Sequence, residues 1–142
     1  MAKIFATMLF AVSLAAMPAM AQTPPARPGA LAAQHAAAAG SWNIVFDDGT
    51  SRRVCLRDIE PLIQLAHPGP TCGRFVITDA ADRATVHYTC PGAGWGRTSL
   101  LVETPRLVRI NSQGIVNRMP FAFDAEARRV GECDSPPIRH QR

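Results

Sequence analysis

The stretch RFVITDAADRATVHYTC, residues 74–90, decides the fold of this 142-residue chain. On the first arm Phe75 and Ile77 share one parity, on the second arm Val86, Tyr88 and Cys90 alternate with polar residues, and the polar segment DAADR separates the two arms. Because successive side chains of a β-strand point to opposite faces of a sheet, this alternation is typical of two half-buried strands joined by a turn. The stretch therefore predicts a β-hairpin with one face toward a core.

The same pattern recurs on both sides of this hairpin. Upstream, residues 41–56 predict another hairpin, because alternating residues flank the turn segment DDGT. Downstream, the pattern predicts strands through 100–102 and 108–110, then a turn at NSQG, residues 111–114, and a last strand through 115–123. Six or seven short strands with tight turns indicate a mainly β protein, an antiparallel meander that forms an open sheet or a barrel.

The alternation also assigns a face to individual strand residues. A shift of one residue in register would invert a whole strand, so each assignment tests the prediction of its strand. The residues expected to face one core are Trp42, Ile44, Phe75, Val86, Tyr88, Val108 and Phe121. The residues expected to face solvent are Asn43, Thr85, His87 and Arg109.

The segment between the two hairpins predicts one short helix, residues 58–66. Asp58 is a suitable N-cap, Pro61 fits the first turn, and apolar residues recur at spacings of three and four. The helix is expected to end at His67, because Pro68 disfavours helical geometry in the residue before it.

The first 21 residues have the features of a secretory signal peptide. Lys3 supplies the positive start, an apolar run follows, and residues 19–21 form a small-x-small cleavage site. A membrane span needs about 20 consecutive apolar residues, and Pro18 interrupts this run well before that length. We therefore expect a periplasmic or secreted protein without a membrane span.

Composition divides the rest of the chain into three parts. Residues 22–40 are rich in proline and then alanine, with almost no large apolar side chain, and predict a flexible linker. Residues 41–134 carry the strand patterns and the cysteines and predict the β-rich, disulfide-bonded domain. Residues 135–142 are expected to form a tail.

All the basic residues beyond the leader are arginines. Lys3 is the only lysine, so 14 arginines against 11 acidic residues leave a net charge of +3 without the leader. Arginine suits bidentate contact with phosphate or carboxylate, which would fit an acidic polymer or an anionic lipid. The arginines are scattered among acidic residues, however, as on an ordinary solvated surface. No nucleic-acid recognition motif is present in the sequence, and we expect no nucleic-acid partner.

The four cysteines, Cys55, Cys72, Cys90 and Cys133, predict two disulfides, because an exported protein meets an oxidising compartment. Four cysteines allow three connectivities. We favour Cys55 with Cys72 and Cys90 with Cys133, since this sequential pattern closes each bridge without threading the other. The crossed pattern, Cys55 with Cys90 and Cys72 with Cys133, is the alternative. No C-x-x-C pair occurs in the sequence, so we expect no structural zinc site.

No constellation of residues predicts a catalytic, cofactor or metal site. His87 and Cys90 are three residues apart, a separation that places them on opposite faces of a strand. His35, His67 and His140 are expected to be surface residues of turns or tails. We therefore predict no catalytic residue, no cofactor and no metal ligand.

The glycine-rich segment CPGAGWG, residues 90–96, is the other candidate for a binding loop. Phosphate-binding loops of this composition lead into the N-terminus of a helix. The residues that follow here favour a strand, so we interpret the segment as a turn or bulge with Trp95 packed over it.

Several short motifs occur in a distinctive order along the predicted domain. They are G-S-W at 40–42, R-V-C-L at 53–56, Cys72, Cys90 before the glycine-rich turn, and R-V-G-E-C at 129–133. In this order they resemble the small exported bacterial proteins of domain-of-unknown-function family 3617. The resemblance implies a signal peptide and a β-rich domain with no established activity. The chain departs from the methionine-rich sheet segments of that family in having only Met119 there.

These features together predict a non-enzymatic binding or envelope-associated module whose partner is an envelope ligand or protein. One alternative is a small periplasmic hydrolase that uses carboxylate pairs such as Asp47 with Asp48 or Asp79 with Asp82, although acidic residues are common in turns.

The other alternative is a structural or inhibitor-like protein that acts through a surface patch. An exposed cluster of Trp42, Trp95 and phenylalanine side chains would support it.

Overall fold

The computed structural model describes residues 30–69 and 71–134. The described chain contains seven strands and one short 3-10 helix, η1 (Glu60–Leu62). The strands are β1 (Gly40–Phe46), β2 (Ser51–Leu56), β3 (Gly73–Ala80), β4 (Arg83–Cys90), β5 (Gly94–Thr104), β6 (Leu107–Val116) and β7 (Met119–Gly131). The prediction of a mainly β, antiparallel fold is confirmed.

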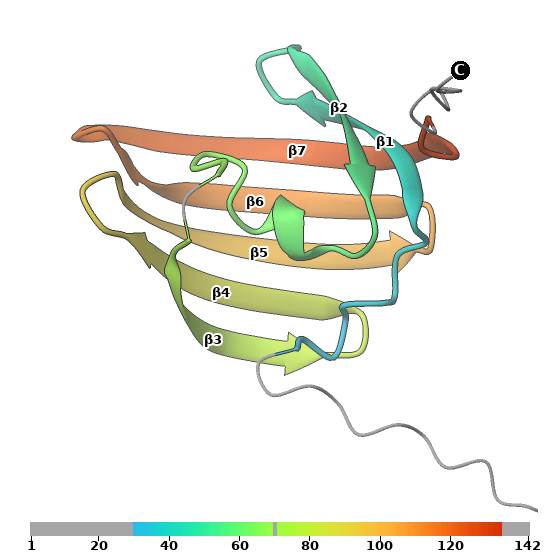
Figure 1. Cartoon of the computed structure of the whole chain (residues 1–142), viewed down its shortest axis with the longest axis horizontal. Helices are drawn as coiled ribbons and strands as arrows, with labels where there is room; N and C mark the ends of the chain where they lie inside the picture. The colour runs from blue at the N-terminus through green and yellow to red at the C-terminus, as the bar shows by residue number, and fades with distance from the viewer. Residues whose placement is uncertain (1–29, 70, 135–142) are drawn as a thin grey trace, which may run out of the picture.

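All seven strands belong to one open sheet with the order β2-β1-β7-β6-β5-β4-β3 (Figure 1). Strands β3 to β7 form the predicted meander, but the first hairpin does not continue it. Instead β1 pairs with the last strand, β7, so that β2 and β3 become the two opposite edges of the sheet. The connection from β2 to β3, residues 57–72, must therefore cross from one edge to the other. We call this segment the strap.

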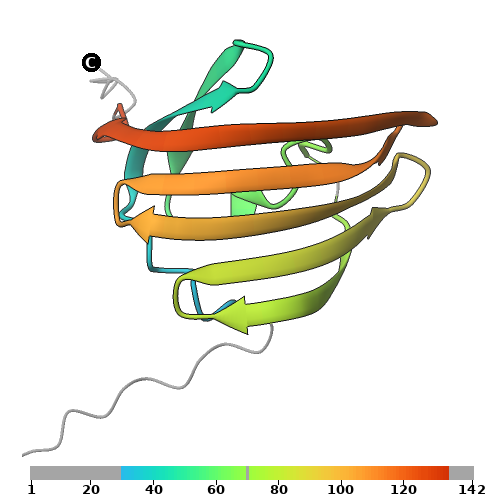
Figure 2. The same cartoon turned by 180° about the vertical axis from the view of Figure 1, so that it is seen from behind.

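The strap lies against one face of the curved sheet, which we call the inner face, and leaves the outer face open (Figures 1 and 2). The predicted inward set is largely confirmed, since Trp42, Ile44, Val86, Tyr88 and Val108 are all buried. The outward set is also confirmed: Arg109 is exposed, and Asn43, Thr85 and His87 are half-buried on the outer face.

One inward prediction differs from the structure. Phe75 is 68% exposed, so its prediction is wrong. It pairs with the outward residue His87, while the neighbouring Arg74 and Val76 pair with the inward residues Tyr88 and Val86.

Phe121 faces inward, as predicted, with its ring centroid 6.0 Å from that of buried His67, and is half-buried. It pairs with Gly114, where a Cβ atom would come within 2.9 Å of the Phe121 ring, so a glycine is needed beneath it.

The predicted helix at 58–66 is wrong in type, because the segment forms only the single 3-10 turn η1. The apolar spacing correctly identified the side that is buried, since Ile59, Leu62 and Ile63 are fully covered. Asp58 accepts a hydrogen bond from the backbone N–H of Glu60 at 2.9 Å, as a cap would. A longer helix does not form because the chain has to cross the sheet toward β3.

The turn predicted at NSQG, residues 111–114, is also wrong, because these residues lie inside β6. The chain reverses instead at Asn117 and Arg118, whose φ angles of 50° and 66° are typical of a tight hairpin turn. Ser112 faces the core, where its hydroxyl lies 2.7 Å from that of Thr98. Residues that are common in turns therefore belong here to a strand, where the polar side chain of Ser112 meets that of Thr98 in the core.

The flexible linker predicted at 22–40 is wrong for the part that the structure describes. Residues 30–39, which we call the N-terminal segment, run along one end of the sheet from β3 to β1 (Figure 1). Leu31, Ala33 and Ala37 are buried there. The backbone N–H of Ala32 donates to Asp79 Oδ1 at 2.7 Å. Residues 1–29 and 135–142, with the predicted leader and tail, lie outside the described residues.

All four cysteines form disulfides, but both favoured pairings are wrong. Cys55 pairs with Cys133 and Cys72 with Cys90, the nested connectivity. The reason is the sheet order: β1 lies between β2 and β7, so Cys55 and the segment that follows Gly131 meet at the same end of the sheet. Cys72 and Cys90 extend the register of the second hairpin by one pair, with Cα atoms 4.4 Å apart.

Candidate functional site

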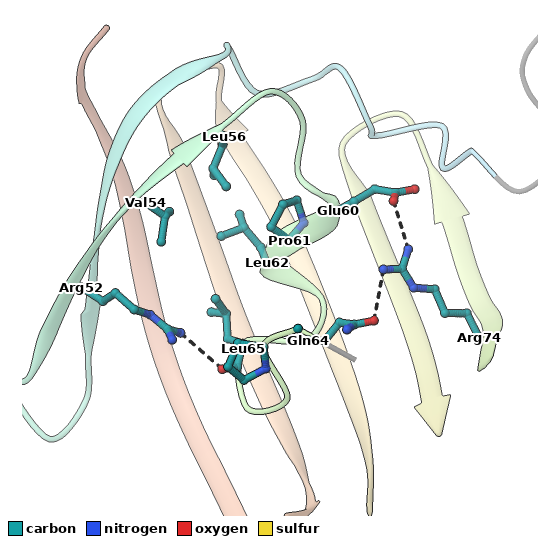
Figure 3. A pocket seen from close by; sticks show the side chains of 11 residues that line it. Arg52, Val54, Leu56, Glu60, Pro61, Leu62, Gln64, Leu65 and Arg74 are labelled. Carbon is teal, nitrogen blue, oxygen red and sulfur yellow. Dashed lines mark hydrogen bonds and ion pairs between the residues drawn. The ribbon is translucent and has the colours of Figure 1, made fainter. Parts of the chain in front are cut away.

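The strap and β2 enclose a cleft of about 330 Å³ (Figure 3). This volume lies at the lower end of the range for small-molecule sites, which is about 300 to 1,000 Å³. Its walls are mainly apolar and come from Val54, Leu56, Pro61, Leu62, Leu65 and Pro68. Its polar side chains are Arg52, Glu60, Gln64 and Arg74.

The alternation of β2 builds one wall of the cleft. Arg52, Val54 and Leu56 occupy every second position of the strand and therefore share its inner face. The strap supplies the opposite wall, because η1 fixes Leu62 against the core and places Leu65 across from β2 (Figure 3). The edge position of β2 leaves this wall open to a ligand.

Arg74 enters the cleft from β3 and is fully compensated. Its guanidinium forms an ion pair with Glu60 at 3.2 Å and donates to Gln64 Oε1 at 3.2 Å. Both charged side chains are about one-third exposed, so this pair acts mainly to hold the strap in place.

The guanidinium of Arg52, unlike that of Arg74, forms no ion pair within the described chain. Its Nη2 donates one long hydrogen bond to the Leu65 carbonyl at 3.3 Å, and its guanidinium carbon lies 5.7 Å from the centroid of the Phe46 ring. The Nε atom is buried without a hydrogen-bond partner in the described chain. No described carboxylate lies within ion-pair distance of Arg52.

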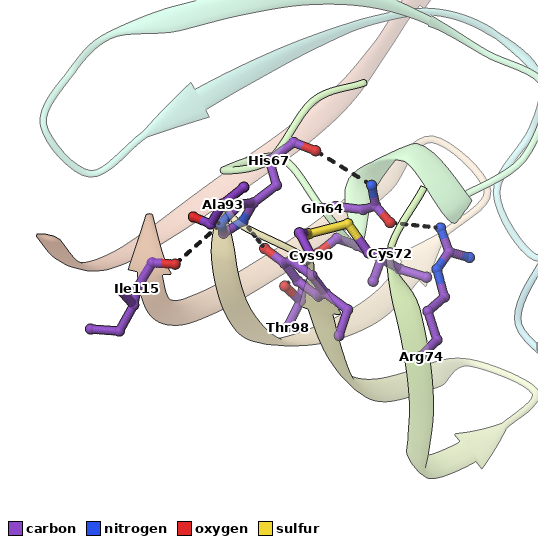
Figure 4. The surroundings of a disulfide bond; sticks show 10 residues. Gln64, His67, Cys72, Arg74, Cys90, Ala93, Thr98 and Ile115 are labelled. Carbon is purple, nitrogen blue, oxygen red and sulfur yellow. Dashed lines mark hydrogen bonds between the residues drawn. A yellow bond between two sulfur atoms is a disulfide. The ribbon is translucent and has the colours of Figure 1, made fainter. Parts of the chain in front are cut away.

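His67 anchors the far end of the strap. It is 3% exposed, which contradicts the expectation of a surface histidine. Its Nε2 lies 3.1 Å from the Ile115 carbonyl and 3.3 Å from the Ala93 carbonyl, and its Nδ1 lies 3.1 Å from the Tyr88 hydroxyl (Figure 4). Two carbonyl acceptors at Nε2 require a proton on that nitrogen.

Tyr88 lies at the bottom of this arrangement and is fully buried. Burial raises its pKa to about 12, because the phenolate would lose its hydration. Its ring covers Gly96, where any Cβ atom would lie 2.4 Å from the Tyr88 hydroxyl oxygen. The glycine-rich segment thus makes room for the tyrosine that holds His67.

Two further links fix the strap to the sheet. The Thr98 hydroxyl donates to the Ile63 carbonyl at 2.6 Å and lies beside Ser112. The Cys72–Cys90 disulfide attaches the end of the strap to the end of β4 (Figure 4). One wall of the cleft is therefore held in position by hydrogen bonds, an ion pair and a covalent bond.

The residues considered from sequence are not brought together into a catalytic site. His87 and Cys90 face opposite sides of β4, as predicted, and the His87 ring stacks on Trp95 with 5.4 Å between centroids. Trp95 is 40% exposed and lies on the outer face, on strand β5 rather than over the turn. His35 is exposed in the N-terminal segment, and His140 lies outside the described residues.

The carboxylate pairs of the hydrolase alternative gain no support from their surroundings. Asp48 accepts hydrogen bonds from the backbone and the hydroxyl of Thr50, which lower its pKa. Asp82 is paired with Arg83 at 2.9 Å, and its pKa is lowered as well, first by that hydrogen bond. Both carboxylates are thus engaged by neighbours in their own turns.

The surface cluster of the inhibitor-like alternative is not formed as expected. Trp42 is fully buried, and its indole N–H donates to the Ala38 carbonyl at 3.0 Å. Phe75 and Trp95 remain exposed on the outer face.

Sequence reasoning missed the cleft although one signal for it was present. Arg52 shares one face of its strand with Val54 and Leu56 and so places a charge on an apolar face. A charge in such surroundings is costly unless it has a partner, and it therefore indicates a binding site. The strap, which covers that face, could not be positioned without knowing that β2 and β3 are the two sheet edges.

The described residues hold no group of three or more His, Cys, Asp or Glu side chains arranged to bind a metal ion. Between residues 30 and 134, position 70 aside, no helix is both long and apolar enough to cross a membrane. Comparison of the chain with known protein families, curated proteins and solved structures gives no match. The resemblance to domain-of-unknown-function family 3617 stays a prediction.

Proposed function

We propose that this protein is an exported, non-enzymatic binding module that holds a small, mainly apolar ligand in the cleft between β2 and the strap. The observation that carries the proposal is the cleft itself, about 330 Å³ in volume, with apolar walls and a few convergent polar groups. Such a combination is the usual composition of a small-molecule site.

The attachment of the strap supports this proposal. A cleft between two mobile segments would have to be ordered when the ligand binds, and that ordering lowers affinity. Here His67, Thr98 and the Cys72–Cys90 disulfide fix the strap before any ligand arrives. The site is thus preorganised.

The export part of the proposal has separate support. Two disulfides fit an oxidising compartment, and the leader features of the sequence point to secretion. Intact-mass measurement on protein from a producing bacterium tests it. A chain that begins at Gln22 supports export, whereas a chain that retains the leader contradicts it.

Binding is tested with the neutral apolar dye N-phenyl-1-naphthylamine, whose emission rises when it leaves water. We expect saturable binding to the full exported chain and at least tenfold weaker binding to Leu65→Trp, where the larger ring fills the cleft. Leu107→Trp is the matched control, because Leu107 is also half-buried but lies on β6, away from the cleft.

Both outcomes of the dye titration are informative. Unchanged binding by Leu107→Trp with loss in Leu65→Trp places the dye in the cleft. Equal binding by both variants, or no saturable binding by the unmodified protein, contradicts the proposed function.

A further inference from the structure

We propose that the ligand of this cleft is an amphipathic anion, with a carboxylate or phosphate head group bound by Arg52 and an unbranched hydrocarbon tail against the apolar walls. This inference rests on the proposed function, because it concerns the same cleft. It adds the chemical class of the ligand and the residue that selects it.

The charge balance of the cleft leaves one positive charge uncompensated. Arg52 and Arg74 both line the cleft, and Glu60 is the acidic side chain among the lining residues. Glu60 is engaged by Arg74 at 3.2 Å. Within the described chain Arg52 has no such partner, so an anion is the complement that the cleft lacks.

The hydrogen-bonding state of Arg52 indicates how an anion would bind. A guanidinium has five N–H donors in a planar fork, and a carboxylate or phosphate accepts from two of them side by side. Within the described chain, Arg52 donates one long hydrogen bond, 3.3 Å, to the Leu65 carbonyl and lies 5.7 Å from the centroid of the Phe46 ring. The buried Nε has no acceptor among described atoms, so the hydrogen-bonding capacity of this guanidinium is only partly used within the described chain.

The position of Arg52 along β2 explains why the ligand should also have a tail. Arg52, Val54 and Leu56 follow one another on the same face, so the charge lies at one end of an apolar row. At about 3.3 Å per residue, this row is about 13 Å long. Leu62 and Leu65 of the strap face it across the cleft (Figure 3). A head group at Arg52 therefore directs a single extended tail toward Leu56.

The neighbouring arginine provides a matched control. Arg53 has the same charge, lies one residue along the same strand, and is exposed on the opposite face, where it pairs with Asn43. Neutralising Arg53 changes the net charge of the protein by the same amount as neutralising Arg52. It leaves the cleft intact.

The experiment measures displacement of N-phenyl-1-naphthylamine by four ligands that share one tail: decanoate, decyl phosphate, decanol and decyltrimethylammonium. We expect the unmodified protein to bind decanoate or decyl phosphate at least tenfold more tightly than decanol, and the cation most weakly. In Arg52→Gln, decanoate and decyl phosphate should bind no more tightly than decanol. The affinity of this variant for decanol should stay within twofold of that of the unmodified protein. Arg53→Gln should behave like the unmodified protein.

A preference for decanoate over decyl phosphate points to a free fatty acid, and the reverse preference points to a lipid phosphate. Both support the inference. Equal affinity for decanoate, decyl phosphate and decanol, or an anion preference that survives in Arg52→Gln, would overturn it and leave the proposed function standing. Failure of the dye itself to bind would instead defeat the proposed function.

A folding defect in Arg52→Gln, seen as an altered near-ultraviolet circular dichroism spectrum, would not remove the test. The comparison of decanoate, decanol and the decyl cation on the unmodified protein still decides whether the cleft selects an anion, because these ligands differ mainly in the charge of the head group.

Discussion

The sheet and the segments that cover it are stabilised in different ways. Strands β3 to β7 are joined by antiparallel ladders with two register shifts, and the buried residues of β4 and β6 occupy every second position. The cover, by which we mean the N-terminal segment (residues 30–39) and the described residues of the strap (57–69 and 71–72), has one turn of 3-10 helix in the part that the structure describes. Isolated hydrogen bonds, one ion pair and one disulfide hold the cover in place.

This difference shows that the cover derives its order from the sheet, while the sheet needs the cover to bury its inner face. Ile59, Leu62 and Ile63 of the strap are fully buried, and so is Ala33 of the N-terminal segment. Neither part has a complete core alone. We therefore expect the two to unfold together, and the cleft between them to disappear in that step.

The two disulfides test this comparison with the largest expected effect. Cys55–Cys133 joins β2 to the segment that follows β7, with a sequence separation of 78 residues. Cys72–Cys90 joins the strap to β4, with a sequence separation of 18 residues. By loop entropy, replacing both cysteines by alanine should cost about 4.5 kcal/mol for the first bridge and about 3 kcal/mol for the second. Urea unfolding of the two double variants measures both costs.

The location of the effects should differ as well as their size. Loss of Cys72–Cys90 should raise amide hydrogen exchange in the strap more than in β5 and β6, because the bridge is a local attachment of the cover. A larger cost for the 18-residue bridge, or uniform exchange in both variants, would show that the cover and the sheet are not distinguished in this way.

The sheet could be predicted from the sequence where local alternation decides the structure. Trp42 and Ile44, or Val86 and Tyr88, alternate with polar residues inside short hairpins, and these hairpins were found correctly. The register of the second hairpin even implies the Cys72–Cys90 pair. The sequential disulfide prediction missed this pair because it rested on closing each bridge without threading the other, and not on the register of the strands.

The cover could not be predicted because its contacts are long-range. Ala32 is held in place by a hydrogen bond to Asp79. His67 is held by Tyr88, Ala93 and Ile115, which lie 21 to 48 residues away from it in the sequence. An alanine-rich segment gives no local sign of such partners.

The candidate site lies where these two kinds of region meet. Its sheet wall follows from alternation, but its strap wall depends on the pairing of β1 with β7.

A core truncation in the strap gives the second test. Leu62 is fully buried although it belongs to the cover, and Leu62→Ala should lower the free energy of unfolding by about 3 to 4 kcal/mol. Pro61→Ala is the control, because Pro61 is the exposed neighbour in the same turn. Urea unfolding followed by tryptophan fluorescence reports on the sheet through Trp42. If Leu62→Ala lowered the free energy of unfolding by less than about 1 kcal/mol, the strap would not be part of the core.

The smallest expected effect comes from the tyrosine beneath the cover. Tyr88 is the only tyrosine of the chain, so tyrosinate absorbance reports on this residue alone. Its pKa is raised from 10 to about 12 by burial, so in the folded state it keeps its proton where the unfolded chain has lost it. The stability that this difference provides is complete below pH 10 and is lost as the pH rises through about 12.

The loss should amount to about 2 to 3 kcal/mol, since each pKa unit corresponds to about 1.4 kcal/mol. A hydrogen bond with Ser112 lowers the pKa of Tyr88, but the effect of burial is larger. Urea unfolding at a series of pH values should show the decline in the unmodified protein and its absence in Tyr88→Phe. If tyrosinate formed near pH 10 in the folded protein, the cover would have to open far more readily than its contacts with His67 and Thr98 imply, and the cleft would not be preorganised.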